Sequence, residues 1–202
     1  MKLFIFDMGG VVVHNAAVIP AIAQSLKISQ DDFFRGAGSD PEVTRTSPYH
    51  LGDIAALMKG ALDAHQFWDN FKKRTGISVK GDPWYDFFNP VLNNDTVDVI
   101  KGLHQKGCRV VCGTNTLDAH YRKHRDRGDY TCFDAVYASH LMGAIKPHPE
   151  FWTCILNKEA LTPEETFFTD DYEENIIAAG KLGLKTHLFT QAASLRSVLN
   201  LS

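Results

Sequence analysis

The chain of 202 residues has few of the features that assign a protein to a class at first sight. Its four cysteines include no C-x-x-C pair and match no zinc-site spacing, so we expect neither a disulfide framework nor a zinc module. No apolar run approaches the roughly 20 residues that cross a membrane, and the first residues lack the pattern of a signal peptide. A formal charge of −3 argues against a broad nucleic-acid-binding face. We therefore expect a cytoplasmic protein, monomeric by default, that binds neither membranes nor nucleic acids.

Short apolar runs are what the sequence does contain. Most of them are apolar on both faces, which is typical of strands in a parallel sheet covered by helices. The five runs are Leu3–Phe6, Arg109–Gly113, Ala135–Ser139, Thr166–Thr169 and Thr186–Phe189. Segments with helical spacing follow between the later runs, at Asn94–Lys106, Pro149–Asn157 and Glu173–Leu182. This alternation predicts an α/β fold with a doubly wound, Rossmann-like parallel sheet.

The connection after the first run is too long for one crossover helix. It extends from about residue 15 to about residue 90 and contains three segments of helical pattern, Ala16–Leu26, Leu51–Leu57 and Asp63–Arg74. Its aromatic residues are expected to form a core of their own: Phe67, Trp68, Phe71, Trp84, Phe87 and Phe88. We therefore predict a core domain of residues 1–14 and 91–202, with an inserted helical domain of residues 15–90.

Chemically active side chains follow four of the predicted strands. Ligands of open α/β sheets bind at the carboxyl ends of the strands, near a switch in strand order. The residues found there are Asp7, Gly9, Gly10, Thr114, Asn115, Lys146, Asp170 and Asp171. A carboxylate can attack phosphorus, carboxylates hold Mg²⁺, and a hydroxyl, an amide and an ammonium can surround a phosphoryl group. The set therefore predicts phosphoryl transfer.

Each of these residues also has an ordinary structural explanation. Asp7 could be a turn residue, Thr114 a helix cap and Lys146 a surface lysine, and Asp171 could belong to an acidic helix start. The joint pattern, with the required residue types in one order and each beyond a strand, favours a shared site over these separate roles.

At these residues the sequence resembles the haloacid dehalogenase superfamily. The four matching segments are Phe6–Val12, Val110–Asn115, Lys146–Pro147 and Phe167–Asp171, the last followed by Asn175. The first segment is similar to the branch that contains α-D-glucose-1-phosphate phosphatase-like proteins. The resemblance implies a Rossmann-like core with a helical cap inserted after the first motif. It also implies a hydrolase that acts on small phosphate esters, such as sugar phosphates, with Mg²⁺ as cofactor.

The resemblance further implies a role for each residue. Asp7 would be the nucleophile and a metal ligand, and the carbonyl of Gly9, with Asp171 and Asp170, would complete the protein ligands of Mg²⁺. Thr114 and Asn115 would bind phosphate, with the backbone of Gly9 and Gly10 near it. Lys146 would hold the carboxylate of Asp7 together with a phosphate oxygen.

Position 9 departs from the family pattern, because most phosphatases of the superfamily carry a second aspartate there as general acid and base. Glycine at this position leaves three outcomes open: substrates with good leaving groups, a substitute acid such as His14, His50 or Asp53, or weak catalysis. The alternatives to a phosphatase are a haloacid dehalogenase-type enzyme, a phosphosugar mutase-type enzyme that transfers to a sugar, and a binding protein that has lost turnover.

Overall fold

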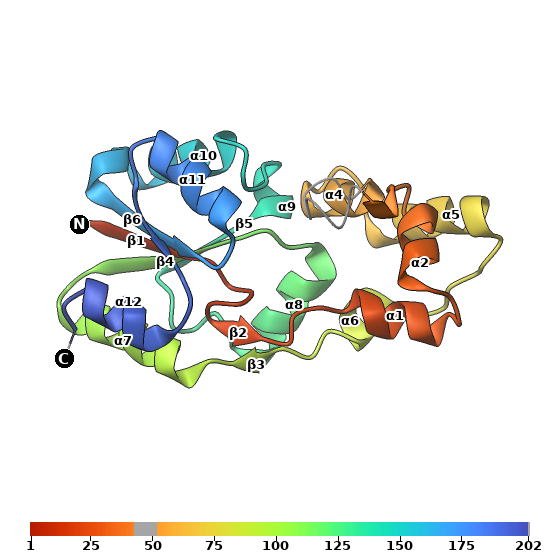
Figure 1. Cartoon of the computed structure of the whole chain (residues 1–202), viewed down its shortest axis with the longest axis horizontal. Coiled ribbons are helices and arrows are strands. Elements are labelled where there is room, and N and C mark those ends of the chain that lie inside the picture. The colour runs from red at the N-terminus through yellow and green to blue at the C-terminus, as the bar shows by residue number, and fades with distance from the viewer. Residues whose placement is uncertain (43–51, 202) are drawn as a thin grey trace.

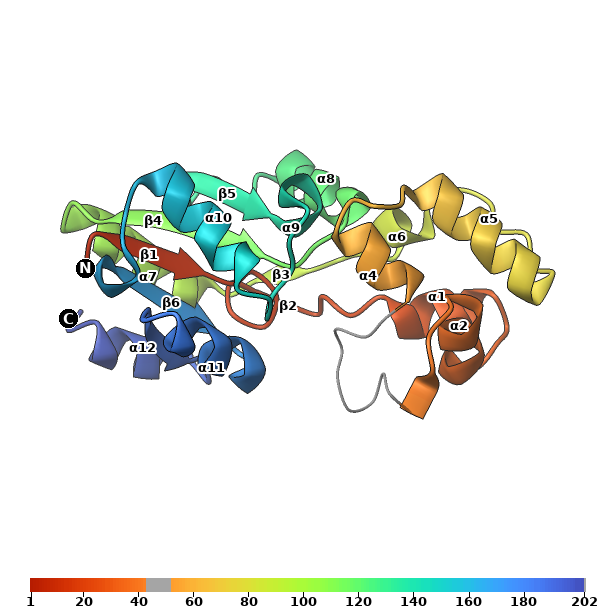
Figure 2. The same ribbon diagram turned by 90° about the horizontal axis from the view of Figure 1, so that it is seen from above.

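The computed structural model describes residues 1–42 and 52–201, which form two lobes (Figure 1). One lobe contains the sheet and both chain termini, and the other contains the helices between residues 19 and 86. Two chain segments join the lobes, one leading out to the helices and one leading back (Figure 2). In the described part of the chain, no helix has both the length and the apolarity needed to span a bilayer.

The sheet has five parallel strands in the order β5-β4-β1-β6-β7. The strands are β1 (Leu3–Phe6), β4 (Arg109–Thr114), β5 (Ala135–Ala138), β6 (Thr166–Asp170) and β7 (Lys185–Leu188). All five predicted runs are therefore strands, and the predicted α/β fold with a parallel sheet is confirmed. Because β1 lies at the centre, the chain moves outward to β4 and β5 before it returns to β6 and β7. The switch in strand order is therefore at β1, where ligand sites of such sheets occur.

Helices cover both faces of the sheet, as the doubly apolar strands require. Phe4 and Phe6 of β1 belong to one buried cluster with residues of α7 and α12, and Leu3 and Ile5 belong to another with residues of α10 and α11. These helices are α7 (Asn94–Gln105), α10 (Glu150–Glu159), α11 (Glu173–Lys181) and α12 (Ala192–Val198). The three helices predicted in this region are confirmed, with ends within two residues of the expected ones.

A short antiparallel pair joins the two ends of the helical insertion. Strand β2 (Val13–His14) pairs with β3 (Val91–Leu92), with Val13 opposite Leu92. The chain therefore leaves the sheet lobe and returns to it at adjacent points. We propose on this basis that residues 15–90 form a cap domain on a core of residues 1–14 and 91–202.

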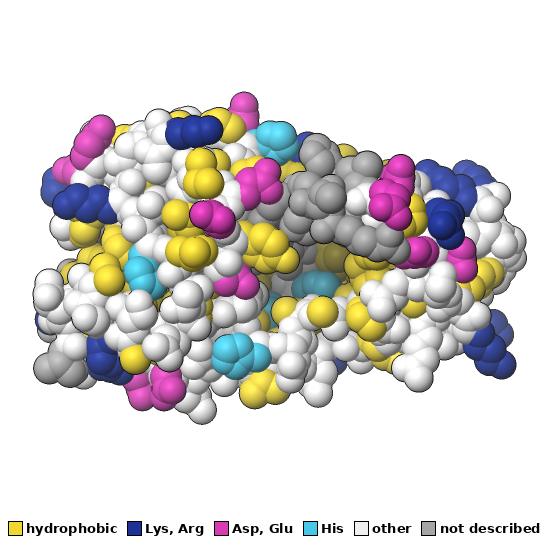
Figure 3. Space-filling view, in the orientation of Figure 1, with side chains coloured by type: hydrophobic (Ala, Val, Ile, Leu, Met, Phe, Trp, Pro, Cys, Tyr) yellow, Lys and Arg dark blue, Asp and Glu magenta, His cyan; other side chains and the backbone are white. Residues whose placement is uncertain are grey.

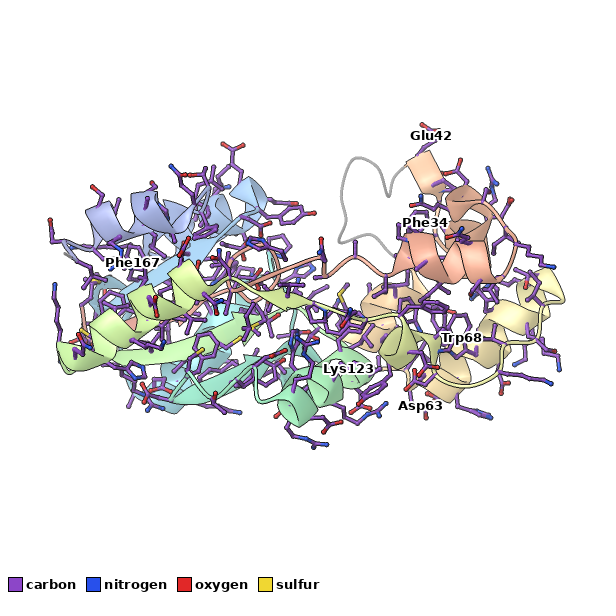
Figure 4. All side chains as sticks on the ribbon, turned by 90° about the horizontal axis from the view of Figure 1, so that it is seen from below. Phe34, Glu42, Asp63, Trp68, Lys123 and Phe167 are labelled. Atoms are coloured by element: carbon purple, nitrogen blue, oxygen red, sulfur yellow. The ribbon has the colours of Figure 1, made fainter. Side chains whose placement is uncertain are left out.

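The helical lobe consists of five described helices packed around aromatic rings. They are α1 (Ile19–Ser25), α2 (Gln30–Gly36), α4 (Asp53–Met58), α5 (Ala64–Thr75) and α6 (Pro83–Asp86). Phe67, Phe71, Trp84 and Phe88 are buried, and Trp68 lies among the side chains of this lobe (Figure 4). The prediction was wrong for Phe87, which follows the last residue of the short helix α6 and is 41% exposed.

The predicted cap helices differ from the observed ones in their ends. Helix α1 starts at Ile19 rather than at residue 16, because Pro20 sits at its first turn, where a proline is tolerated. Helix α4 starts at Asp53, and Leu51 of the predicted segment lies outside the described residues.

Three short helical segments complete the sheet lobe: α8 (Asp118–Arg127), α9 (Ser139–Met142) and a 3₁₀ turn at Pro163–Glu165. Helix α8 contacts the helical lobe at α6, where the ammonium of Lys123 lies 4.2 Å from the ring centre of Tyr85. Figure 4 shows Lys123 on α8, near the junction of the lobes. A cation over an aromatic face is attractive, so this contact helps to hold the lobes together.

Candidate active site

The carboxyl edge of the sheet brings the predicted residues together. Asp7 directly follows β1, Thr114 ends β4 and Asp170 ends β6. Lys146 comes from the loop between α9 and α10. Its side chain extends to the same edge of the sheet, where it is only 1% exposed. Side chains far apart in the sequence thus meet because the parallel strands that precede them end at one edge.

The ammonium of Lys146 is the centre of the cluster. It donates to Oδ1 of Asp7 at 2.7 Å, to Oδ2 of Asp170 at 2.7 Å and to the carbonyl of Gly113 at 3.1 Å. An ammonium has three N–H donors, so these three bonds use its full capacity. The lysine therefore has a fixed position between two carboxylates.

The second carboxylate of this ion-pair network, that of Asp170, is fully buried and held from several sides. Besides Lys146, it accepts a hydrogen bond from the backbone N–H of Tyr172 at 2.8 Å. The side-chain amide of Asn175 donates to both of its oxygens at 3.0 Å. A buried carboxylate needs such partners, and here they fix its orientation.

Three carboxylates converge beside this lysine. Asp7, Asp170 and Asp171 each place one oxygen so that all three oxygens lie within 4.8 Å of one another. Hard cations such as Mg²⁺ prefer oxygen ligands of this kind. Asp171 also lines the open cleft described below, whereas Asp170 does not.

Gly10 lets Asp171 approach the loop after β1. It has a φ of +74°, and a Cβ atom at this position would lie 2.0 Å from Oδ2 of Asp171. Any side chain here would therefore push the carboxylate away, in addition to the strain of the left-handed backbone. Gly9 differs, because a Cβ there would meet only the Cβ of Ala16, at 3.8 Å.

Asn115 joins the ends of two loops. Its Nδ2 donates to the carbonyl of Lys146 at 2.9 Å, and its Oδ1 accepts from the N–H of Lys146 at 2.8 Å. The side chain thus holds the backbone of the lysine in place. The amide nitrogen carries two hydrogens, so one remains for a ligand. Thr114, which is 4% exposed, precedes it and lines the cleft.

The charges of the cluster do not balance without a cation. Burial raises the pKa of Asp7 to about 7, although the Lys146 ammonium acts to lower it. Burial and the neighbouring Asp170 carboxylate raise the pKa of Asp171. Burial acts to lower the pKa of Lys146, but the carboxylates of Asp170 and Asp7 outweigh it, so the net direction is upward. The lysine is therefore charged, and the charged forms of Asp7 and Asp171 are disfavoured unless a cation lies beside them.

A cleft of about 630 Å³ opens over these groups, between the two lobes. Figure 3 shows the hollow, with acidic side chains at its sheet side and hydrophobic side chains toward the helical lobe. Its volume is in the range of small-molecule sites. The lining combines the predicted residues Asp7, Gly9, Gly10, Thr114, Asn115, Lys146 and Asp171 with His14, Asn15, Ala16, Ala17, Met58, Tyr172 and Asn175.

The three candidates for a substitute acid differ in their surroundings. His14 lines the cleft. Asp53 lies in the helical lobe, where it accepts hydrogen bonds from Arg74 at 2.7 Å and from Asn70 at 3.2 Å. His50 lies outside the described residues. Of the two described candidates, only His14 faces the cleft.

Some lining residues were not predicted from the sequence. Met58 of α4 and the connector residues Asn15, Ala16 and Ala17 reach the cleft because the helical lobe lies over the sheet edge. No local pattern marks them. Tyr172 directly follows the acidic pair, and this adjacency is the signal that could have found it.

The site geometry agrees with three relationships to known proteins. The haloacid dehalogenase-like hydrolase family model matches residues 1–183. The sesquiterpene phosphatase astK of Aspergillus oryzae is 32% identical over 193 residues, which cover 91% of this chain and 87% of that protein. Acyl-CoA dehydrogenase family member 10 of the mouse is 24% identical over 199 residues, which cover 92% of this chain. The chain spans only 17% of the length of this mouse protein.

A solved structure shows the same fold. It is a haloacid dehalogenase family enzyme of Bacteroides thetaiotaomicron in complex with magnesium and inorganic phosphate. It matches with a TM-score of 0.71 at 23% identity, over 94% of each chain. The family match spans most of the sequence, and a relative above 30% identity shares nearly its whole length. The chain therefore belongs to the haloacid dehalogenase-like hydrolase family.

Proposed function

We propose that the protein is a Mg²⁺-dependent phosphatase that hydrolyses small phosphate monoesters through an aspartyl-phosphate on Asp7. The observation that carries this proposal is the buried ammonium of Lys146, which lies 2.7 Å from Asp7 and 2.7 Å from Asp170 at the floor of the cleft. This arrangement orients the carboxylate of Asp7, which lines the cleft and is open to a ligand. The magnesium and phosphate bound by the Bacteroides enzyme, and the phosphatase name of the Aspergillus relative, support the same assignment.

The donor set fits a divalent cation. Three carboxylates beside one ammonium leave a formal charge of −2, and one oxygen of each carboxylate lies within 4.8 Å of the other two. Asp7, Asp171 and the carbonyl of Gly9 would hold Mg²⁺, and Asp170 would support the site from its buried position. When bound, the ion would neutralise charge on the phosphate oxygens and so reduce the repulsion that the carboxylate of Asp7 meets as it approaches phosphorus.

The chemistry then follows from the residues of the chain. A carboxylate oxygen of Asp7 attacks phosphorus and forms the Asp7–phosphate bond, while the bond to the ester oxygen breaks and that oxygen keeps the electron pair and takes a proton. Water next attacks phosphorus, which releases inorganic phosphate and restores the carboxylate. The ammonium of Lys146 favours the charged form of Asp7 and offsets part of the effect of its burial, because an opposite charge favours ionisation.

Phosphate recognition falls to groups on three loops. The donors that would meet the phosphate are the hydroxyl of Thr114, the second amide hydrogen of Asn115 and the backbone N–H of Gly9, all from residues that line the cleft. The N–H of Gly10 already donates to the carbonyl of Val13 at 2.8 Å. The positive charge of Lys146, at the floor of the cleft, attracts the phosphate. Several fixed donors around an oxyanion stabilise the charge that develops in the transition state.

The leaving oxygen needs a proton donor, since Gly9 supplies none. We infer that His14 takes this role, because it lines the cleft while Asp53 is bound to Arg74 in the other lobe. General acid catalysis contributes about 10²–10⁴-fold to such steps. A proton donor is needed when the leaving group is poor, as an alkoxide is. It is not needed when the leaving group is nitrophenolate.

Trapping the intermediate tests the proposal. The protein is mixed with Mg²⁺ and ³²P-labelled acetyl phosphate, quenched in acid within one turnover, and digested for mass spectrometry. We expect label on the peptide that contains Asp7, and none in the Asp7→Asn variant. Label on another residue, or chloride release from 2-chloropropionate without Mg²⁺, would replace this assignment by a different reaction of the family. Transfer of the label to an added sugar rather than to water would indicate a mutase-type enzyme.

A further inference from the structure

A second, smaller pocket of about 180 Å³ lies beside the catalytic cleft, on the side of the helical lobe. It is lined by Val18 and Ile19 at the start of α1, by Ile54 of α4 and by Leu117, which precedes α8. Ala16, Ala17, Met58 and Asn115 line both the cleft and this apolar pocket. The two spaces therefore adjoin each other, and a molecule bound at Asp7 can extend into the apolar pocket.

No acidic side chain, lysine or arginine lines the apolar pocket in the part of the chain that the structure describes. Apart from the rings of Trp84 and His120, the polar residues of its lining are Asn115, which it shares with the cleft, and Thr116, and both already make hydrogen bonds. Asn115 is bonded to the backbone of Lys146, and the N–H of Thr116 donates to Oγ of Ser139 at 2.9 Å. The wall facing the ligand is therefore mainly aliphatic and aromatic, which suits an apolar group.

Two aromatic ring systems complete the lining. Burial lowers the pKa of His120 to about 3, so its ring is uncharged at neutral pH. Nε2 of His120 and Nε1 of Trp84 are buried and have no hydrogen-bond partner among the described residues. Because both atoms are buried, neither is exposed to the pocket to pair with a hydroxyl of a sugar. Each buried hydroxyl without a partner lowers affinity.

We propose that the apolar pocket binds the organic part of the substrate, so that the natural ester is the monophosphate of an apolar alcohol rather than of a sugar. This inference rests on the proposed phosphatase function and specifies its substrate class. The phosphate lies at Asp7 and Lys146, and the carbon chain passes Ala17 and Met58 into the pocket. A sugar phosphate leaves the pocket unfilled or buries hydroxyls in it, and both outcomes weaken binding.

Binding of alkylphosphonates tests the pocket without requiring turnover. Methyl-, butyl- and octylphosphonate are titrated calorimetrically into the full chain with Mg²⁺. We expect the affinity to rise about fourfold for each methylene until the pocket is full, so that octylphosphonate binds at least about a hundredfold more tightly than methylphosphonate. Equal affinities of the three phosphonates would overturn the proposal.

A matched pair of variants locates the effect. Ala17→Asp places a charge at the entrance of the pocket, and the preference for octyl- over methylphosphonate is expected to fall at least tenfold. Ala61→Asp introduces the same charge at an exposed alanine of the helical lobe that lines neither space, and the preference is expected to remain. Because the preference is a ratio of the affinities for the two phosphonates, any effect of the new charge on phosphonate binding in general cancels. An undiminished preference in Ala17→Asp would place the apolar site elsewhere and overturn the proposal.

Measured turnover of two different esters distinguishes a failure of the proposed substrate class from a failure of the proposed phosphatase function. With octyl phosphate and glucose 1-phosphate as substrates, we expect kcat/KM to favour the octyl ester by at least tenfold. Hydrolysis of both esters with equal kcat/KM would confirm the phosphatase and overturn the substrate class. No hydrolysis of any ester, including 4-nitrophenyl phosphate, would overturn the function itself.

Discussion

Lys146 Nζ lies 2.7 Å from Oδ1 of Asp7, although 139 residues separate them in the sequence. The lysine is 1% exposed and the aspartate 9% exposed, so the ion pair forms in a largely water-free site. Such pairs are costly to break, since the remaining charge is left buried. The contact ties the loop after β1 to the loop before α10, and the cleft opens above it.

Gly10 is predicted to be essential for the metal site. In Gly10→Ala the added Cβ would overlap Asp171, 2.0 Å from its Oδ2, so the carboxylate must move and Mg²⁺ affinity should fall at least tenfold. Calorimetric titration with Mg²⁺ measures this change. Gly107→Ala is the matched control, because Gly107 has a similar φ of +73° and no atom within 4 Å of the added Cβ. Both variants should lose about 1–2 kcal/mol of stability from backbone strain. If Gly107→Ala lost as much Mg²⁺ affinity as Gly10→Ala, the role of Gly10 would be refuted.

Asn175 is predicted to tune the metal site through Asp170. Its amide donates to both carboxylate oxygens at 3.0 Å, so Asn175→Ala frees the carboxylate to reorient. Loss of such a supporting contact typically lowers metal affinity about 10–100-fold. The Mg²⁺ concentration for half-maximal activity should rise by this factor, with Asn157→Ala on the exposed side of α10 as control. An unchanged Mg²⁺ requirement in a folded Asn175→Ala protein would contradict the account.

The proton donor is predicted to matter only for poor leaving groups. His14→Gln should lower kcat for octyl phosphate about 10²-fold and leave kcat for 4-nitrophenyl phosphate nearly unchanged. Steady-state rates with both substrates decide this point. Equal losses on the two esters would show that His14 acts in binding or folding rather than as the acid.

Position 9 has room for an acidic side chain. A Cβ there would meet no atom closer than 3.8 Å, so Gly9→Asp should fold normally. When this change is added to His14→Gln, kcat for octyl phosphate should be at least tenfold higher than in His14→Gln alone. Gly9→Ala, which has the same backbone effect without a carboxyl group, should restore nothing.

His120 is predicted to make stability depend on pH. Burial lowers its pKa to about 3 in the folded chain, while the unfolded ring takes up a proton below about pH 6.5. Between these values the unfolded state binds more protons, so the free energy of unfolding falls as the pH falls, by up to about 1.4 kcal/mol per pH unit. His120→Phe should remove this part of the slope, as measured by urea unfolding at pH 6, 5 and 4. The same change at His65, whose side chain is 85% exposed, is the control, and equal slopes in all three proteins would contradict the prediction.

Local sequence was enough to predict the sheet and to place most of the candidate site residues at one edge of it. Runs such as Val110–Gly113 are apolar on both faces, which few structures other than a covered parallel strand require. Once the strands were placed, Asp7, Thr114 and Asp170 were expected to lie together, because the carboxyl ends of parallel strands meet at one edge of the sheet. The pair β2–β3 escaped prediction because strands of two residues leave no periodic pattern.

Other features depend on contacts that no local pattern records. Asn115 was predicted to bind phosphate, but its pairing with Lys146 depends on how a loop 31 residues away returns to the sheet edge. Met58 and Ala17 reach the cleft only through the packing of the helical lobe against the sheet lobe. The role of each site residue and the domain boundaries, 1–14 and 91–202 for the core and 15–90 for the cap, stay predictions.

The most direct test of the central claim is phosphate release from 4-nitrophenyl phosphate by the wild-type protein and by Asp7→Asn, each with Mg²⁺ and with excess chelator. The account predicts turnover by the wild-type protein that requires Mg²⁺, and release at the background rate by Asp7→Asn even though that variant remains folded. Undiminished release by Asp7→Asn, or turnover by the wild-type protein that persists without the metal, would contradict it.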